Sequence, residues 1–200
     1  MAYDVSKNFN LMNTPSHYIL NLAFLGQTIA PKQNVAITVG ALLPDIPIFL
    51  FYAIAKYIYK LPESKIWSEA YYEPLNQNIV ALSHSIPLAV IGCVICYFCK
   101  WEFGMVLCAS MVCHSLLDLP VHNDDAHRHF YPFSNYRFIS PFSYWDIKHF
   151  AKYVAGFEVL LVLIANPFVM MMLKSPWTKG IVVLVDLVYV FGYTRFYLFR

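Results

Sequence analysis

The chain has 200 residues, of which 59% are hydrophobic, 18% aromatic and only 13% charged, and its formal net charge is +2. A soluble domain is nearer half apolar and a quarter charged, so this composition excludes a disordered chain, a coiled coil and most soluble enzymes. So small a net charge gives no indication of a basic surface that binds nucleic acid. We therefore expect an all-α, multi-pass transmembrane bundle that forms a single domain over residues 1–200, with the lipid bilayer as its partner.

Six apolar stretches are predicted to form helices, and about 20 apolar residues are enough to cross a bilayer. The first stretch is the shortest, although it has a favourable start, with Thr14 as the expected N-cap and Pro15 at the first helical position. A buried or surface-lying helix is the alternative for that stretch. In chain order the expected spans are residues 15–30, 35–59, 79–99, 103–119, 154–173 and 180–198.

Basic residues are distributed unequally between the two ends of such a bundle, and the richer end is expected to be cytoplasmic. The poorer end carries Lys32, Lys100, Lys174 and Lys179. The richer end carries Lys7, Lys56, Lys60, Lys65, Arg128, Arg137, Lys148, Lys152, Arg195 and Arg200. Both chain termini are then expected on the cytoplasmic side.

Several polar or reactive side chains in the apolar stretches are expected to serve structure rather than chemistry. The five cysteines all lie in such stretches, and an odd number gives no disulfide framework. We interpret them as small packing residues, although the spacing of Cys93, Cys96 and Cys99, every three residues, can mimic a metal motif. Glu158 and Asp186 have no histidine near them in sequence, and we expect them to pair with Tyr hydroxyls or with Arg195.

Other ionisable side chains lie in or beside the expected spans, where their cost makes them functional candidates. His114 and Asp118 are the sharpest pair, because residues four apart in a helix leave the same face. Imidazole nitrogen and carboxylate oxygen at that spacing can hold one metal ion or two adjacent ones. The alternative is a neutral histidine hydrogen-bonded to the aspartate. Pro120 is expected to end the helix.

Asp45 lies between Pro44 and Pro47, and each proline disfavours a helical conformation of the residue before it. The span is therefore expected to break here, where the carboxylate either caps the second half-helix or faces a cation at membrane depth. His17 and His84 lie near the ends of their expected spans, and a hydrogen-bonded core histidine is the alternative for His84. All of these candidates except Asp45 gather at the cytoplasmic end, which favours a metal site.

A polar run rich in histidine, VHNDDAHRHF, follows the fourth expected span. Its candidate metal ligands are His122, Asp125, His127 and His129. In an extended segment Asp125, His127 and His129 would share one face, whereas Asp124 and Arg128 would face solvent.

These motifs resemble those of a known family. A histidine near the N-terminus, then GALLPDI, HS on a later span, and HSLLD followed by YPF are similar to bacterial membrane-bound metal-dependent hydrolases, the YdjM-like inner-membrane proteins, over residues 13–150. That family is similar in turn to zinc-dependent phospholipases C, which are helical and use a His/Asp cluster. The resemblance implies a bacterial inner-membrane location. It also implies metal-ligand roles for His17, Asp45, His84, His114 and Asp118.

Two positions depart from the family pattern, because Pro47 stands where a second Asp is usual and Ile79 where an earlier His is usual. The His-rich loop is one source of replacements. A site with fewer metal ions, or one that binds without catalysing, is the alternative.

The favoured function is a hydrolase with a divalent metal ion, for which zinc suits the His/Asp set best, acting on a phosphoester or lipid-linked substrate at the cytoplasmic side. Asp45 is the expected bridging ligand or water-activating base, and His127 or His129 the expected acid for the leaving group. One alternative is a metal-ion carrier, because transporters build midplane sites at broken spans. The other is a membrane scaffold that uses the same groups for buried hydrogen bonds. The oligomeric state stays open.

Overall fold

The computed structural model describes residues 13–28, 30 and 32–199, and within these residues it is helical and contains no strand. The all-α prediction is therefore confirmed. Residues 1–12 with Lys7, residues 29 and 31, and Arg200 lie outside the described residues.

Nine α-helices are seen in the described part of the chain, with five shorter turns between or after them. The helices are α1 (Asn13–Thr28), α2 (Asn34–Leu42), α3 (Ile46–Ala53), α4 (Glu63–Ser68), α5 (Pro74–Ser83), α6 (Ile86–Phe98), α7 (Glu102–Asp118), α8 (Ala151–Met172) and α9 (Pro176–Tyr193). The 3-10 turns are η1 (Leu43–Asp45), η3 (Ala70–Tyr72) and η4 (Ile147–His149), and the π turns are η2 (Ile54–Ile58) and η5 (Thr194–Leu198).

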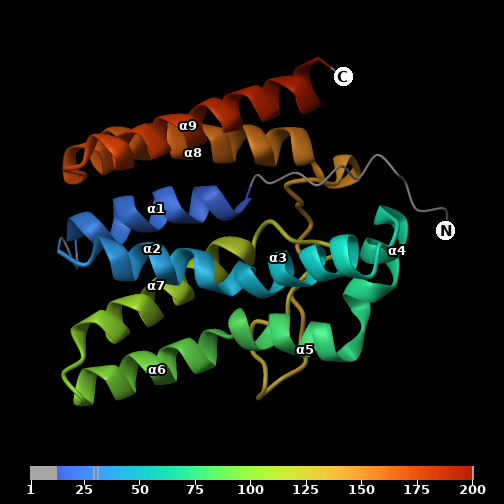
Figure 1. Cartoon of the computed structure of the whole chain (residues 1–200), viewed down its shortest axis with the longest axis horizontal. Helices are drawn as coiled ribbons and strands as arrows, with labels where there is room; N and C mark the ends of the chain where they lie inside the picture. The colour runs from blue at the N-terminus through green and yellow to red at the C-terminus, as the bar shows by residue number, and fades with distance from the viewer. Residues whose placement is uncertain (1–12, 29, 31, 200) are drawn as a thin grey trace.

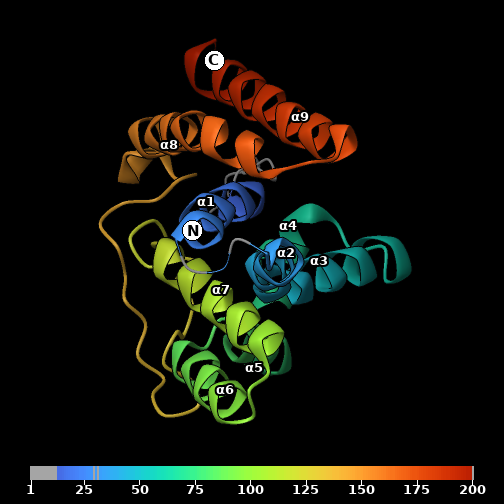
Figure 2. The same cartoon turned by 90° about the vertical axis from the view of Figure 1, so that its left-hand side faces the viewer.

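Helix α1 lies in the middle of the bundle, where it packs against α2, α7 and α8 (Figures 1 and 2). Helix α9 packs along α8 at one edge, and α6 packs along α7 at the other. Apolar side chains of α1, among them Ile19 and Leu22, meet Ile37 of α2 and Val162 of α8 in the buried core. The central helix therefore carries its polar residues directly into the interior.

Helices α2 and α7 approach each other closely at Gly40. A Cβ atom added there would lie only 2.3 Å from the backbone oxygen of Leu107 and 2.7 Å from Cβ of Ser110. Only glycine leaves room for this approach. The contact brings the backbone of α2 against the middle of α7, and the backbone oxygen of the next residue, Ala41, lies 2.7 Å from Nδ1 of His114.

Three helical stretches are long and apolar enough to cross a membrane: Asn34–Ile58, Ala151–Met172 and Pro176–Leu198. The pair α5 and α6, bent by 42°, would be a fourth. Helix α1 has 16 residues and α7 has 17, so each falls short of about 20 residues. Six complete spans are therefore not confirmed.

The predicted span over residues 79–99 is a broken helix. Ser85 caps a new helix there, since its hydroxyl accepts a hydrogen bond from the backbone N–H of Leu88 at 3.2 Å. Pro87 follows inside the first turn, where a missing N–H costs nothing. The break places His84 at the end of α5 instead of inside a continuous helix.

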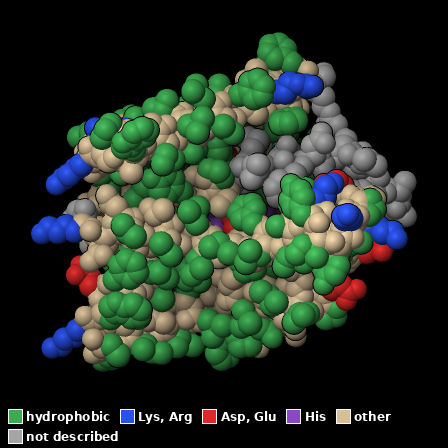
Figure 3. All heavy atoms as spheres, in the orientation of Figure 1, with side chains coloured by type: hydrophobic (Ala, Val, Ile, Leu, Met, Phe, Trp, Pro, Cys, Tyr) green, Lys and Arg blue, Asp and Glu red, His purple; other side chains and the backbone are tan. Residues whose placement is uncertain are grey.

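Charged side chains gather at the two ends of the bundle, and hydrophobic side chains dominate the band between them (Figure 3). The connections α1–α2, α6–α7 and α8–α9 all lie at one end (Figure 1). This end therefore carries the lysines of the poorer side: Lys32, Lys100, Lys174 and Lys179. At the opposite end, residues 119–150 form a long segment whose one short helical turn is η4.

The polar residues assigned to structure have partners inside the bundle. Glu158 accepts hydrogen bonds from the hydroxyls of Ser16 at 2.5 Å and Tyr189 at 3.4 Å, so the predicted tyrosine partner is confirmed. Asp186 accepts a hydrogen bond from Asn166 of α8, in place of the expected tyrosine or Arg195. All five cysteines are free, as predicted.

Candidate metal centre

Four separate parts of the helical bundle bring histidine and aspartate side chains to one buried point. His17 lies in the N-terminal part of α1, Asp45 lies in the η1 turn, and His84 directly follows α5. His114 and Asp118 come from the last turns of α7. The three histidines are at most 1% exposed and Asp118 is 2% exposed. Because each part begins or ends near this point, polar side chains can meet here without interrupting a membrane-facing surface.

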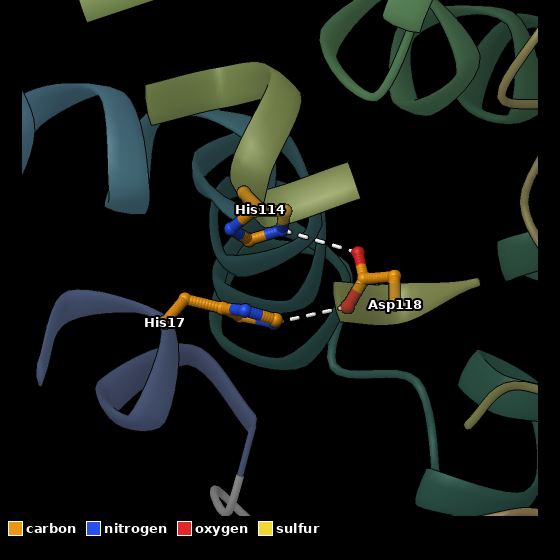
Figure 4. A group of neighbouring side chains, drawn as sticks. All are labelled: His17, His114 and Asp118. Carbon is orange, nitrogen blue, oxygen red and sulfur yellow. Dashed lines mark hydrogen bonds and ion pairs between the residues drawn. The ribbon is translucent and has the colours of Figure 1, made fainter. Parts of the chain in front are cut away.

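Asp118 lies at the centre of the group (Figure 4). Its Oδ1 atom lies 2.9 Å from Nε2 of His17, and its Oδ2 atom lies 3.2 Å from Nε2 of His114. Nε2 of His122 is 3.4 Å from Oδ1, and Nε2 of His84 is 3.7 Å from Oδ2. Each oxygen of this carboxylate therefore faces two imidazole rings.

Asp45 faces the same centre from the η1 turn. Its Oδ1 atom lies 3.3 Å from Nε2 of His84 and 3.6 Å from Nε2 of His114, and its Oδ2 atom accepts a hydrogen bond from the Thr14 hydroxyl. The side chain makes no cap hydrogen bond, although Asp45 stands directly before α3. The cap alternative is therefore wrong. The backbone of Asp45 is helical (φ −84°, ψ −17°) instead of extended as in a typical N-cap residue, and Pro47 removes one of the two N–H groups that a cap could bind.

Backbone carbonyls fix the orientation of two histidine rings. Nδ1 of His84 donates a hydrogen bond to the backbone oxygen of Val80 at 2.9 Å, and Nδ1 of His114 donates to that of Ala41 at 2.7 Å. A carbonyl only accepts, so Nδ1 carries the proton and the lone pair of neutral imidazole is on Nε2. Metal-ligating histidines are typically held in this way.

The distances around His84 and His114 fit a coordination shell better than hydrogen bonds, whereas Nε2 of His17 lies at hydrogen-bond distance, 2.9 Å, from Asp118. Nε2 of His84 and His114 lie 3.2–3.7 Å from the oxygens of Asp45 and Asp118, longer than most hydrogen bonds. Ligands about 2.0–2.2 Å from a tetrahedral zinc ion lie roughly 3.3–3.6 Å from one another. Nε2 of His114 is buried and has no hydrogen-bond partner. A cation between these atoms would satisfy that nitrogen and both carboxylates.

Three overlapping groups of side chains are placed to hold a metal ion, with candidate ligand atoms within 4.8 Å of one another in each group. They are His17–His114–Asp118, Asp45–His84–His114 and His84–Asp118–His127. Buried His/Asp groups that could hold a divalent metal ion are thus present. The shared members His84, His114 and Asp118 make this one centre and not three.

Two histidines of the 119–150 segment, His127 and His129, lie against this centre. The ring of His127 is 4.3 Å from that of His84, and the ring of His129 is 5.8 Å from that of His127. Burial lowers the pKa of His129 to about 4, and burial with the neighbouring His84 and His122 lowers the pKa of His127 well below its usual value. Both rings are neutral at pH 7, which is the form that binds metal.

His122 has the opposite electrostatic setting. Burial opposes its charged form, but the carboxylates of Asp125 and Asp118 raise its pKa well above the usual value. Its Nδ1 atom donates a hydrogen bond to Oδ2 of Asp125 at 2.8 Å, and Trp145 donates to the same oxygen at 3.1 Å. The two carboxylates therefore favour the protonated form of His122.

Asp125 does not share a face with His127 and His129 as expected. The backbone turns at this point, since the N–H of Ala126 donates to the oxygen of Asn123 at 3.2 Å. Asp125 consequently lies behind His122 and belongs to none of the three groups. Its place fits orientation of the His122 ring better than direct contact with a metal ion.

Some contributors were missed from the sequence. Thr14 was expected to cap α1, yet the helix begins at Asn13 and the Thr14 hydroxyl binds Asp45. Its position three residues before His17, on the same helix face, was an available signal. The roles of the Ala41 and Val80 carbonyls had no signal, because any residue supplies such an oxygen.

The chain was also compared with known proteins. No protein-family model, curated protein or solved structure matches it. The resemblance to the YdjM-like hydrolases therefore stays a prediction, and functional inference depends on the geometry of the centre.

Proposed function

We propose that this chain is an integral-membrane, metal-dependent hydrolase whose His/Asp centre holds divalent metal, zinc by its ligand set. One observation carries the proposal: Nε2 of His84 and of His114, each with Nδ1 tied to a backbone carbonyl, point at Asp45 and Asp118 across 3.2–3.7 Å. In a buried setting each Nε2 meets these carboxylates through a positive charge, either a proton or a metal ion, and the three groups of ligand atoms that lie within 4.8 Å of one another favour the metal ion. The membrane is placed as a bacterial inner membrane on the resemblance alone.

The two aspartates take different roles in the proposal. Asp118 presents one oxygen to His17 and His122 and the other to His84 and His114, so it would hold metal at the middle of the centre. The side chain of Asp45 is 13% exposed, in contrast to the closed histidines. Asp45 therefore marks the open side and suits the base that takes a proton from water. A divalent ion supplies Lewis-acid chemistry there, activating water near neutral pH.

The acid role differs from the sequence expectation. His127 and His129 have lowered pKa values and carry no proton to donate at pH 7. We assign them to metal binding instead. His122 has a raised pKa and a carboxylate behind it, so it suits protonation of a leaving group, such as the alcohol of a phosphoester or lipid-linked substrate.

A metal-ion carrier is the second candidate, because Asp45 lies at a break between α2 and α3 within a stretch long enough to span the membrane. Against it, the candidate ligands gather in one centre and do not form a path between the two ends of the bundle.

Substitution Asp45→Asn separates the candidates, because it keeps the side-chain shape and removes the charge. Phosphodiesterase and lipase-type activity on model substrates and metal uptake into proteoliposomes are measured for both proteins, with Asp146→Asn as control. We expect the wild type to hydrolyse substrate and Asp45→Asn to lose activity by orders of magnitude. Wild-type metal flux without hydrolysis would refute the hydrolase proposal, and absence of bound metal would refute both candidates in favour of a scaffold.

A further inference from the structure

Residues 130–142 lie in the segment between α7 and α8 and are here named the aromatic strap. The strap has two chemically different faces. On the inner side, Ser140 is buried, its hydroxyl donates to the backbone oxygen of Pro120 at 2.6 Å, and its N–H donates to that of His122 at 3.0 Å. The outer side chains are large, apolar and exposed. They are Phe133 (69% exposed), Tyr136 (59%), Phe138 (41%), Ile139 (56%) and Phe142 (46%).

The strap lies where a membrane surface would lie. It runs across the helix axes on the outside of the bundle, at the end where α7 ends and α8 begins (Figures 1 and 2). The first residues of α8 continue the apolar surface with exposed Tyr153 and Phe157, and α8 is itself long and apolar enough to span. Aromatic residues gather at this level in membrane proteins, because their rings suit the boundary between headgroups and acyl chains.

Two arginines, Arg128 just before the strap and Arg137 within it, have no carboxylate partner among the described residues. Arg128, which was expected to face solvent, donates to the backbone oxygen of Gln77 at 2.8 Å and to the side chains of Asn78 at 2.7 Å and Asn135 at 3.0 Å. Arg137 donates to the backbone oxygen of Ala126 and to Oε1 of Gln77, each at 2.8 Å. All of these acceptors are neutral, and the Arg128 guanidinium also lies over the Tyr131 ring, 4.9 Å from its centroid. Within the described part of the chain, neither positive charge is paired with a carboxylate.

We propose that the aromatic strap lies in the headgroup layer of the bilayer, with its aromatic rings at the acyl boundary and with Arg128 and Arg137 contacting lipid phosphate. Guanidinium groups suit this role, because their planar fork matches phosphate oxygens. Arg137 uses one N–H on each terminal nitrogen and keeps the other, whereas Arg128 keeps one N–H on Nη1, since both on Nη2 are bonded and Nε is buried. The inference does not depend on metal binding or hydrolysis. It identifies lipid as the ligand of a surface that would otherwise expose five large apolar side chains to water.

Tryptophan placed on the strap tests its depth. The variants Phe133→Trp and Phe138→Trp are reconstituted in phosphatidylcholine vesicles. The emission of the new tryptophan is obtained by subtracting the wild-type emission, and its quenching by brominated lipids and by aqueous iodide is measured. Glu69→Trp is the matched control, since Glu69 is exposed beside α4, beyond the strap. We expect bromine near the headgroup to quench both strap variants and iodide to quench the control. Iodide quenching of the strap equal to that of the control would overturn the proposal, as would protection from both quenchers, the sign of a covering protein copy.

The phosphate contact is tested by removing one charge. Arg137→Gln keeps a neutral donor for the oxygen of Ala126, and Lys65→Gln removes an exposed cation of α4 as control. The measurement is the affinity for phosphatidylglycerol relative to phosphatidylcholine, by competition with brominated lipid. We expect Arg137→Gln to lose about five-fold of this preference, the effect of one cation near an anionic surface. An unchanged preference, or an equal loss in Lys65→Gln, would refute the lipid-phosphate contact.

Discussion

Asp118→Asn exchanges one side-chain oxygen for nitrogen. It should weaken metal binding more than any other substitution in the centre that exchanges a single atom. The two oxygens of Asp118 face imidazole nitrogens at 2.9–3.7 Å, and Asp118 belongs to two of the three groups placed to hold metal. Asparagine preserves the volume but replaces one ligand oxygen by an NH₂ group, which donates and does not ligate. The same change removes a negative charge from a side chain that is 2% exposed.

The size of the effect follows from how closely the carboxylate contacts its partners. Changes behind the metal ligands typically cost 10–100-fold in affinity, so loss of a ligand should cost at least about 100-fold, or about 2.7 kcal/mol. The assay is metal content after purification, followed by competition with a chromophoric chelator. Thermal unfolding of the metal-free protein checks that the variant folds.

A matched control lies in the same chain. Asp146 pairs with a histidine as closely as Asp118 does, since its Oδ2 atom lies 2.9 Å from Nδ1 of His149, but the pair lies outside the three groups. Asp146→Asn should therefore keep metal affinity within a few-fold of wild type. If Asp118→Asn retained full occupancy and affinity, the reasoning from the buried centre would be refuted.

Further predictions concern packing, pH and topology. Gly40→Ala should lower the free energy of unfolding by about 1–3 kcal/mol, because the added Cβ would lie 2.3 Å from the Leu107 backbone oxygen. Gly180→Ala should not lower it, because open space surrounds Gly180. Thermal unfolding in detergent compares the two variants. The folded pKa of His129, about 4, lies below its ordinary 6.5, so the unfolded chain binds the proton more readily. In the metal-free protein, the contribution of His129 to the free energy of unfolding should be fully present above pH 6.5 and should fall by up to about 3 kcal/mol toward pH 4. In unfolding measurements, His129→Gln should reduce this dependence of stability on pH. A reporter fused after Lys100 should be active outside the cytoplasm, and an inside signal would contradict the expected orientation.

The sequence by itself determined the fold class and most of the side chains that meet in the buried centre. An apolar, charge-poor composition requires helices that satisfy their own backbone, and the confirmed all-α fold follows from that need. The spacing of His114 and Asp118 placed both on one helix face, and their Nε2 and Oδ2 atoms lie 3.2 Å apart. The prolines around Asp45 marked the break between α2 and α3, which the η1 turn occupies. These features are local, so a few neighbouring residues are enough to predict them.

Only the tertiary structure decided which atoms meet and which spans are complete. His17 and Asp118 are 101 positions apart, and no sequence spacing relates them; their 2.9 Å contact exists because α1 packs in the middle of the bundle against α7. The proton positions on His84 and His114 depend on the carbonyls of Val80 and Ala41, of which the second belongs to another helix. Asp125 turned away from the expected face because a backbone turn outweighs the alternation of an extended segment. Helix length, ring orientation and burial arise from packing between distant segments, and hydrophobic pattern alone does not encode that packing.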